Sequence, residues 1–274
     1  MIVVTGATGS IGRALVSRLR ESGADVLALV RRAEQGEELG VEYAVGDFER
    51  PSSIPMGDRL FLNTSPWPGF VQRHKEVVDR AAAAGVSQVV AVSVLGATPG
   101  GPLSSGLHGE VDAHLRKSGL THAILEPVGF MQSLPREVAD GRFHGSYGTG
   151  RTGYIDTRDI ADVAFALLTG PVGESATHVL TGPAALSQQE IAARLTATLG
   201  RTVTYVDLSI EEMTRHAQER WGMPEPTARE LAEMMAAVPD SPWSEITGTV
   251  EALTGHPPRS LADYLADHAA DFAT

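Results

Sequence analysis

Two residue types are scarce in this sequence: cysteine is absent, and Lys75 and Lys117 are the only lysines. Without cysteine, neither a disulfide framework nor a thiolate metal site can form. No apolar run approaches the roughly 20 residues that a membrane-spanning helix needs. The strand-like start at Met1 also leaves no room for a signal peptide. We therefore expect a cytoplasmic protein that does not interact with a membrane.

Positive charge is also in short supply, because 34 acidic residues face 22 lysines and arginines, which gives a formal net charge of -12. Such a protein repels nucleic acid, so we do not expect nucleic acid as a partner. The nine histidines include no pair at the H-x-x-x-H spacing of zinc sites. With no cysteine to complement them, no metal site is expected.

The most informative stretch is the first one, where an apolar run leads through three glycines into a helical pattern. Gly6 allows a sharp turn, Gly9 removes a side chain that would block a pyrophosphate, and Gly12 lets the helix lie close to the strand. The free N–H groups of this helix would face the phosphates. In preference to an ordinary glycine-rich turn, we predict a dinucleotide site with contacts from Gly6, Thr8, Gly9, Ser10, Ile11 and Gly12.

Two arginines follow the second apolar stretch, 24–30, at the position where a dinucleotide fold recognises the ribose. An acidic residue there would bind the ribose diol of NAD. Arg31 and Arg32 instead offer guanidinium groups that pair well with the 2′-phosphate of NADP. The sequence therefore predicts NADP(H) as the cofactor, although two arginines could also begin a solvated loop.

Further apolar stretches alternate with helical ones, which predicts an α/β fold with a doubly wound parallel sheet covered on both faces. The next expected strands are 40–45, 59–63, 88–93 and 121–126, with helices at 71–84 and 107–117. Ligands bind at the carboxyl ends of such strands. The candidate cofactor contacts there are Asp47, Phe48, Asn63, Thr64, Ser93, Val94, Pro127 and Phe130. Asp47 and Phe48 could bind an adenine, or they could be a turn aspartate and a packed phenylalanine.

The remaining sequence is less regular. A glycine-rich segment, 142–150, has the composition of a substrate lid and contains His144 and Tyr147. We expect a short strand at 154–155, a helix at 159–168 that returns to the sheet, a strand at 177–181 and another at 203–206. Ser187 and Glu190 form a capping box that opens a helix ending near residue 199, and helices continue from residue 209. The methionines among those helices suggest adaptable core packing, or the lining of a substrate pocket.

These features predict a nucleotide-binding domain at 1–130, to which 154–170 returns, and a small, mainly helical substrate lobe at 131–153 and 171–274. Met131, Tyr147 and Tyr154 are the candidate substrate contacts.

Six motifs identify a family resemblance: Thr5-Gly-Ala-Thr-Gly-Ser-Ile-Gly12, Arg31-Arg32, Gly46-Asp47-Phe48, Ser-Gly-Leu-Thr at 118–121, Ile-Leu-Glu-Pro at 124–127 with Phe130-Met131, and Tyr154-Ile-Asp-Thr-Arg-Asp-Ile-Ala161. Together they resemble the atypical short-chain dehydrogenase/reductases, most of all the NmrA-like group with its quinone-reductase and isoflavone-reductase relatives. The resemblance implies an NADP-binding Rossmann domain and a variable C-terminal lobe that closes over the nicotinamide.

The sequence departs from the superfamily in its proton relay, a tyrosine followed four residues later by a lysine. Neither lysine has a tyrosine at that spacing. His108 occupies the region of the relay, and Asp112 lies one helical turn beyond it, where it could hold the imidazole charged. We therefore name His108, together with Ser93, as candidate catalytic residues. A surface ion pair between His108 and Asp112 is the alternative.

Two function classes follow. The first is an NADPH-dependent reductase of an apolar carbonyl, enone or quinone, such as an aromatic polyketide-type ketone. The second is a non-catalytic NADP(H)-sensing regulatory protein, which the missing relay supports. We expect the enzyme, because the glycine-rich segment and the helical lobe indicate a substrate pocket. Either would act on or respond to small molecules as a monomer or a homodimer.

Overall fold

The computed structural model describes residues 1–272, which form two compact units. Unit 1 contains Met1–Pro127, Thr157–Leu180 and Thr249–His256. Unit 2 contains Val128–Asp156, Thr181–Gly248 and the chain from Pro257. Two segments that the sequence assigned to the substrate lobe therefore lie in unit 1. The first segment contains Ala176–Leu180, which adds an edge strand to the sheet of unit 1. The second contains Thr249–Thr254, a helix that packs against this strand and against the helix Thr157–Thr169.

The centre of unit 1 is a seven-stranded, all-parallel sheet with the order β3-β2-β1-β4-β5-β6-β9. Its strands are β1 (Ile2–Val4), β2 (Val26–Val30), β3 (Glu42–Val45), β4 (Arg59–Leu62), β5 (Gln88–Val92), β6 (His122–Pro127) and β9 (Ala176–Leu180). Most central strands are continuous apolar runs, since both of their faces are covered by helices. The expected doubly wound α/β fold is confirmed.

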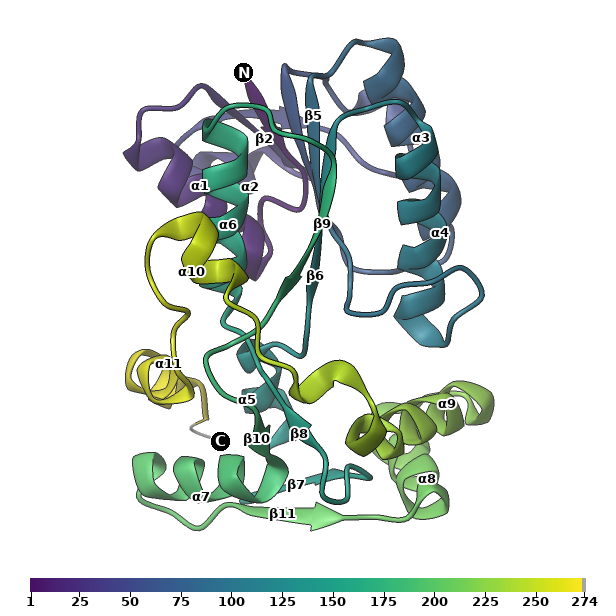
Figure 1. Ribbon diagram of the computed structural model, residues 1–274, viewed down its shortest axis with the longest axis vertical. Helices are drawn as coiled ribbons and strands as arrows, with labels where there is room; N and C mark the ends of the chain where they lie inside the picture. Colours follow the sequence, from purple (N-terminus) through teal and green to yellow (C-terminus); the bar gives the residue numbers. More distant parts are fainter. Residues whose placement is uncertain (273–274) are drawn as a thin grey trace. The chain divides into compact units, whose positions relative to one another are not determined.

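Helices cover both faces of this sheet (Figure 1). On one side lie α1 (Ser10–Glu21), α2 (Ala33–Leu39), α6 (Thr157–Thr169) and α10 (Thr249–Thr254), and on the other α3 (Phe70–Ala83) and α4 (Leu103–Lys117). A short 3-10 turn, η1 (Pro51–Ser53), follows β3. The α4 helix begins four residues before the expected start, and Gly106 and Gly109 allow it to lie directly against the backbone of the preceding loop.

The chain reverses its direction of winding between β1 and β4, the third and fourth strands in the order of the sheet. Strands β2 and β3 lie on one side of this point, and β5, β6 and β9 lie on the other. A crevice opens at the carboxyl ends of strands where the order reverses, and ligands of open α/β sheets bind there. The glycine-rich turn after β1 and the segment after β4 are therefore adjacent.

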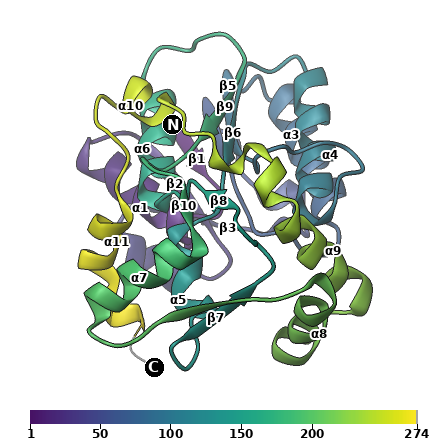
Figure 2. The ribbon, with the colours of Figure 1, turned by 60° about the horizontal axis from the view of Figure 1, so that its bottom comes forward.

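Unit 2 has its own hydrophobic core, which includes Met131, Phe143, Tyr147, Tyr154 and Tyr264. Its strands are β7 (Arg142–Gly145), β8 (Arg151–Thr152), β10 (Leu186–Ser187) and β11 (Thr204–Asp207). Its helices are α5 (Leu134–Glu137), α7 (Gln188–Leu199), α8 (Ile210–Trp221), α9 (Glu225–Ala236) and α11 (Leu261–His268), with short 3-10 turns η2 (Met131–Ser133), η3 (Val238–Asp240), η4 (Pro242–Ser244) and η5 (Ala269–Phe272). Figure 2 brings β7, α7 and α8 of this unit to the front.

Two expectations for unit 2 are corrected. The glycine-rich segment 142–150 is not a free lid, because its first four residues form β7 and pair in parallel with β11. Residues 154–155 form no strand; Ile155 makes a single bridge to Phe130, and the strand lies at β8 instead. The capping box is confirmed, since the Ser187 hydroxyl accepts a hydrogen bond from the N–H of Glu190.

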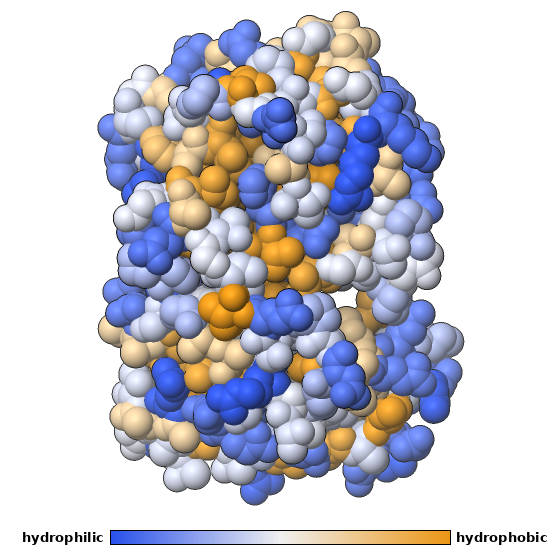
Figure 3. All heavy atoms as spheres, viewed as in Figure 1, coloured by the Kyte–Doolittle hydropathy of each residue, from blue (hydrophilic) through white to orange (hydrophobic). Residues whose placement is uncertain are grey.

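The methionines of unit 2 fit core packing best, because Met213 and Met235 are both buried. On the face shown in Figure 3, hydrophobic residues are interspersed with hydrophilic ones. Among residues 1–272, no helix is both long and apolar enough to span a membrane.

Candidate functional site

The turn between β1 and α1 depends on two glycines that have no room for a side chain. Gly6 has a φ of +61°, and a Cβ built on it would overlap the carbonyl oxygen of Asn63. A Cβ on Gly12 would overlap the carbonyl oxygen of Gly6. These two residues therefore shape the protein itself: one bends the chain after the strand, and the other brings the helix close to that bend.

Gly9 differs from these two glycines, because a Cβ there would meet only the Gly6 carbonyl oxygen, at 3.4 Å. Gly9 is exposed and is the N-cap of α1, where no side chain caps the helix and the first turn has no acidic residue. The first N–H groups of the helix and its positive dipole end are thus available to an anion. A pyrophosphate fits this turn, since it needs both the open space at Gly9 and uncapped donors.

A buried hydroxyl connects this turn to the end of β4. The Oγ1 of Thr5 donates to the carbonyl oxygen of Phe61 at 2.9 Å and accepts from the N–H of Asn63, also at 2.9 Å. Asn63 and Thr64 are therefore held beside Gly6 at the carboxyl edge of the sheet. The sequence reasoning missed Thr5, although a hydroxyl residue between a strand and its turn glycine is a readable signal.

The two arginines after β2 are exposed. Neither guanidinium makes an ion pair with a carboxylate in the described part of the chain. The backbone N–H of Arg32 donates to Oε1 of Gln35 at 3.2 Å as α2 begins. Two unpaired cations at the end of the second strand are suited to bind a phosphate on the ribose.

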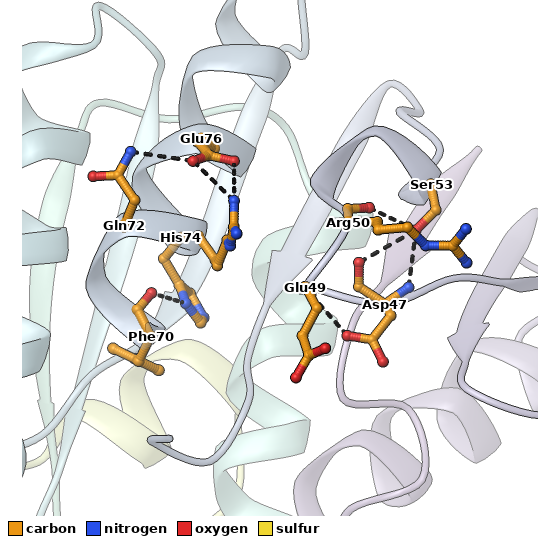
Figure 4. Close-up of polar contacts among 9 residues, drawn as sticks. Asp47, Glu49, Arg50, Ser53, Phe70, Gln72, His74 and Glu76 are labelled. Carbon is orange, nitrogen blue, oxygen red and sulfur yellow. Dashed lines mark hydrogen bonds and ion pairs between the residues drawn. The ribbon is translucent and has the colours of Figure 1, made fainter. Parts of the chain in front are cut away.

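Asp47 and Phe48 lie in the loop after β3, where the structure favours the second of the two sequence interpretations. The Asp47 carboxylate turns back on its own loop and accepts from the N–H of Glu49 at 2.8 Å (Figure 4). The Phe48 ring is 6% exposed and stacks on His74 with centroids 4.6 Å apart. Phe48 is a core side chain, so its expected contact with an adenine is not supported.

His74 belongs to an aromatic cluster with Phe48, Trp67 and Phe70, next to Thr64 in the segment after β4. Its Nδ1 lies 2.8 Å from the carbonyl oxygen of Phe70 (Figure 4), and its Nε2 lies 3.1 Å from the Thr64 hydroxyl. Burial lowers the pKa of His74 to about 4. The ring is therefore neutral at pH 7, donating to the carbonyl through Nδ1 and accepting from Thr64 through Nε2. Sequence reasoning did not single out His74, since its partners come from three different elements.

Ser93, at the end of β5, is paired with Asp112 on α4. Its Oγ donates to Oδ2 of Asp112 at 2.6 Å, and each of the two residues is 1% exposed. Burial raises the pKa of Asp112 to about 6, although the hydrogen bond from Ser93 acts in the opposite direction. The Ser93 hydroxyl proton is committed to this carboxylate.

His108 is buried against an aromatic ring, which excludes the surface ion pair that the sequence offered as the alternative. It is 7% exposed and lies edge-on to the Phe70 ring, with centroids 4.9 Å apart, so it is not part of a surface ion pair. Asp112 is bonded to Ser93, and no hydrogen bond joins it to His108 in the described chain. Burial lowers the pKa of His108 to about 4, so the imidazole is neutral at pH 7. The expectation that Asp112 holds His108 in its charged form is therefore not supported, and a catalytic role for His108 stays a prediction.

The other predicted contacts lie in different surroundings. Thr8 is half-buried and Ser10 is exposed, whereas Ile11 is 5% exposed and offers its backbone N–H alone. Val94 is half-buried beside Ser93, and the carbonyl oxygen of Pro127 accepts from the N–H of Leu95 at 3.0 Å.

The remaining four predicted residues belong to unit 2. Phe130 is half-buried, and Met131, Tyr147 and Tyr154 are buried in the core of that unit. Burial raises the pKa of both tyrosines, so their hydroxyls remain protonated at neutral pH.

Comparison with known proteins agrees with this geometry. The NAD(P)H-binding family model matches residues 6–171. The chain is 36% identical to the NAD(P)H azoreductase of Xenophilus azovorans, with 99% of each chain covered. The crystal structure of an Escherichia coli NADPH-dependent quinone oxidoreductase with NADPH bound superposes with a TM-score of 0.85 at 26% identity, covering 97% of this chain and 99% of that chain. NmrA, described as a negative transcriptional regulator in complex with NADP, shares the fold at 18% identity, with a TM-score of 0.74 and 96% and 93% coverage.

The chain therefore belongs to the NAD(P)H-binding family. The expected likeness to NmrA-like and quinone-reductase-like proteins is confirmed. At the level of the class, the expectations of a Rossmann-type oxidoreductase and of NADP(H) as the cofactor are confirmed as well.

Proposed function

We propose that the protein is an NADPH-dependent reductase of an apolar carbonyl, enone or quinone, including aromatic polyketide-type ketones. The open space at Gly9 in front of the uncapped end of α1 is the observation that carries this proposal. An azoreductase and a quinone oxidoreductase among the relatives support the class of substrate, since both names describe reduction of conjugated acceptors.

We call the turn at Gly6, Gly9 and Gly12, the start of α1, Arg31 and Arg32 the nucleotide cradle, and each of its parts has a separate task. The turn at Gly9 and the N–H groups of α1 would hold the pyrophosphate, while Arg31 and Arg32 would select the 2′-phosphate. Asn63 and Thr64 would line the crevice beside Gly6, where Thr5 holds them in place. NADPH supplies the hydride when it is bound, and the rest of the catalytic task is positioning.

The structure leaves few groups of unit 1 that could deliver a proton. The His108 imidazole is neutral and buried, and the Ser93 proton is bonded to Asp112. A reduced quinone is an oxyanion that water can protonate, and a substrate with its own ring hydroxyl can supply the proton internally. We therefore propose quinones and hydroxylated aromatic ketones as substrates in preference to simple ketones.

A steady-state screen of NADPH oxidation against quinones, enones and cyclic ketones tests the proposal. We expect turnover with quinones and a strong preference for NADPH over NADH. We expect no turnover with the Gly9→Val variant. Tight NADPH binding with no turnover on any acceptor would contradict the reductase and favour a regulatory NADP(H) sensor.

A further inference from the structure

Unit 2 contains a cavity of about 480 Å³ that the reductase proposal does not use. Three parts of the unit form it: α5 with the turn that follows, strand β7, and the last turns of α8. The lining residues are Arg136, Glu137, Ala139, Asp140, Arg142, His144, His216, Arg220 and Trp221. All of them belong to unit 2, whereas the nucleotide cradle belongs to unit 1.

A tight turn positions one wall of this cavity. Asp140 and Gly141 have φ angles of +50° and +69°, the left-handed pair that a two-residue hairpin turn requires. Ala139 and Arg142 exchange two backbone hydrogen bonds of 2.8 Å across the turn. The chain then continues as β7, where Arg142 and His144 are two residues apart and share one face.

Helix α8 provides the opposite wall. His216 and Arg220 are four residues apart and therefore lie on one side of the helix, with Trp221 beside them. The helix ends at Gly222, whose N–H donates to the carbonyl oxygen of Gln218 at 3.0 Å. This hydrogen bond satisfies one of the carbonyl groups at the end of the helix. Fewer free carbonyl oxygens therefore remain there to compete for the guanidinium group of Arg220.

The charges around the cavity are unbalanced. Arg136, Arg142 and Arg220 make no ion pair with any carboxylate in residues 1–272, although the protein as a whole is strongly acidic. Glu137 and Asp140 are the two acids in the lining. Burial raises the pKa of Glu137, which disfavours its charged form. Three arginines thus line the cavity, with at most two negative charges in the lining to offset them.

Flat rings complete the site. The rings of His144 and His216 lie 4.4 Å apart and are inclined by 32°. The ring of Trp221 meets His216 edge-on, with centroids 5.6 Å apart, and Trp221 is 41% exposed. An exposed indole next to paired imidazoles offers a surface on which a planar ring can stack.

We propose that this cavity binds a small aromatic oxyanion, a planar ring that carries a sulfonate, carboxylate or phosphate group. The guanidinium groups of Arg136, Arg142 and Arg220 bind the anionic group, and the Trp221 ring stacks on the planar part. This is a second binding site, separate from the nucleotide cradle and independent of the proposed reductase reaction.

Three probes test the proposal, and saturating NADP⁺ in every titration fills the cradle first. Naphthalene-2-sulfonate has both the ring and the charge, 2-naphthol has the ring without the charge at pH 7, and inorganic phosphate has the charge without the ring. Calorimetry should show one sulfonate bound per chain, at least tenfold more tightly than either of the other two. Equal binding of 2-naphthol would overturn the proposal, and so would no sulfonate binding.

Variants assign the site. Arg142→Gln combined with Arg220→Gln should weaken sulfonate binding at least tenfold, because it removes two of the three cations. Both side chains are exposed, so the fold should persist, which a melting curve checks. Arg229→Gln controls for the loss of an arginine elsewhere in unit 2, because Arg229 is paired with Glu233 on α9 and does not line the cavity. If the sulfonate stacks on Trp221, it should quench tryptophan fluorescence in the wild type, and Trp221→Phe should abolish this quenching. Unchanged affinity in the double variant would place the sulfonate elsewhere and refute the assignment.

Discussion

The two units build their candidate sites in different ways. The part of the unit 1 cradle that would hold the pyrophosphate is made by backbone: three glycines, a turn and the first N–H groups of α1. The cavity of unit 2 is made by side chains that come from α5, β7 and α8. A backbone site is contained in one short segment, and its shape requires particular residues. A side-chain site needs the tertiary fold before its members meet.

The contrast among the three glycines of the cradle separates the fold from the ligand. Gly6 and Gly12 are needed by the protein itself, whereas Gly9 leaves space that the protein does not fill. The same turn thus serves stability at two positions and binding at the third. Substitution of Gly12 should therefore lower the stability of the fold, whereas substitution of Gly9 should remove cofactor binding and leave the fold intact.

Gly12→Val should have the largest effect of all. Its side chain would overlap the carbonyl oxygen of Gly6 and come within 2.8 Å of the Ala7 Cα, and backbone atoms cannot move away cheaply. We expect a loss of about 3 kcal/mol or more in the free energy of unfolding, together with loss of NADPH binding. Urea denaturation measures the first and calorimetry the second. A variant of wild-type stability would contradict the close packing of α1 on the turn.

Gly9→Val should remove NADPH binding and leave the fold. Valine tolerates the φ of -79° and ψ of 173° found here, and only the Gly6 carbonyl oxygen lies near the new Cβ. We expect at least a hundredfold loss of NADPH affinity, with a change of about 1 kcal/mol in the free energy of unfolding. If NADPH still raised the melting temperature of this variant as it does in the wild type, the phosphates would lie elsewhere.

The same contrast explains what the sequence could predict. The doubly wound sheet and the glycine turn were readable because strand hydrophobicity and turn geometry are local. The surroundings of Phe48 and His108 could not be predicted in the same way, because they are not local in sequence. Phe48, in the loop after β3, is covered by His74 of α3, and His108 of α4 packs against Phe70, also of α3.

The partner of Ser93 was missed for a similar reason, since Asp112 is 19 residues away in sequence and had been assigned to His108. The i, i+4 spacing placed two side chains on one helix face but did not say which strand that face would meet. For the same reason, no sequence pattern indicated the cavity of unit 2.

Loss of the arginines at the end of β2 should have an intermediate effect. The charge-assisted hydrogen bonds of the two arginines to a phosphate should together contribute about 1–3 kcal/mol, so Arg31→Ala combined with Arg32→Ala should lower the preference for NADPH over NADH by about 5–150-fold. Binding of NADH should barely change. Arg50→Ala is the charge-matched control for each single variant, because Arg50 is another exposed arginine of this unit and lies in the loop after β3. Equal dissociation constants for the two cofactors in the wild type would refute the assignment of the 2′-phosphate.

His108→Phe should have the smallest effect on activity, because a neutral, buried imidazole is not placed to donate a proton at pH 7. We expect kcat to remain within about threefold of the wild-type value and NADPH affinity to be unchanged, whereas an essential general acid would cost about 10²–10⁴-fold. A loss of that size with normal cofactor affinity would restore His108 as the proton donor.

The effect of this substitution should appear in acid stability instead. The pKa of His108 is about 4 in the folded protein and 6.5 as a free side chain, so the unfolded chain binds more protons between these values. His108 therefore lowers the stability of the wild type as the pH falls from 6.5 towards 4, by at most about 3 kcal/mol. His108→Phe removes this contribution, and the free energy of unfolding should fall less steeply over that range. Parallel curves for the two proteins, measured by urea denaturation at several pH values, would mean that the imidazole of His108 is already charged in the fold.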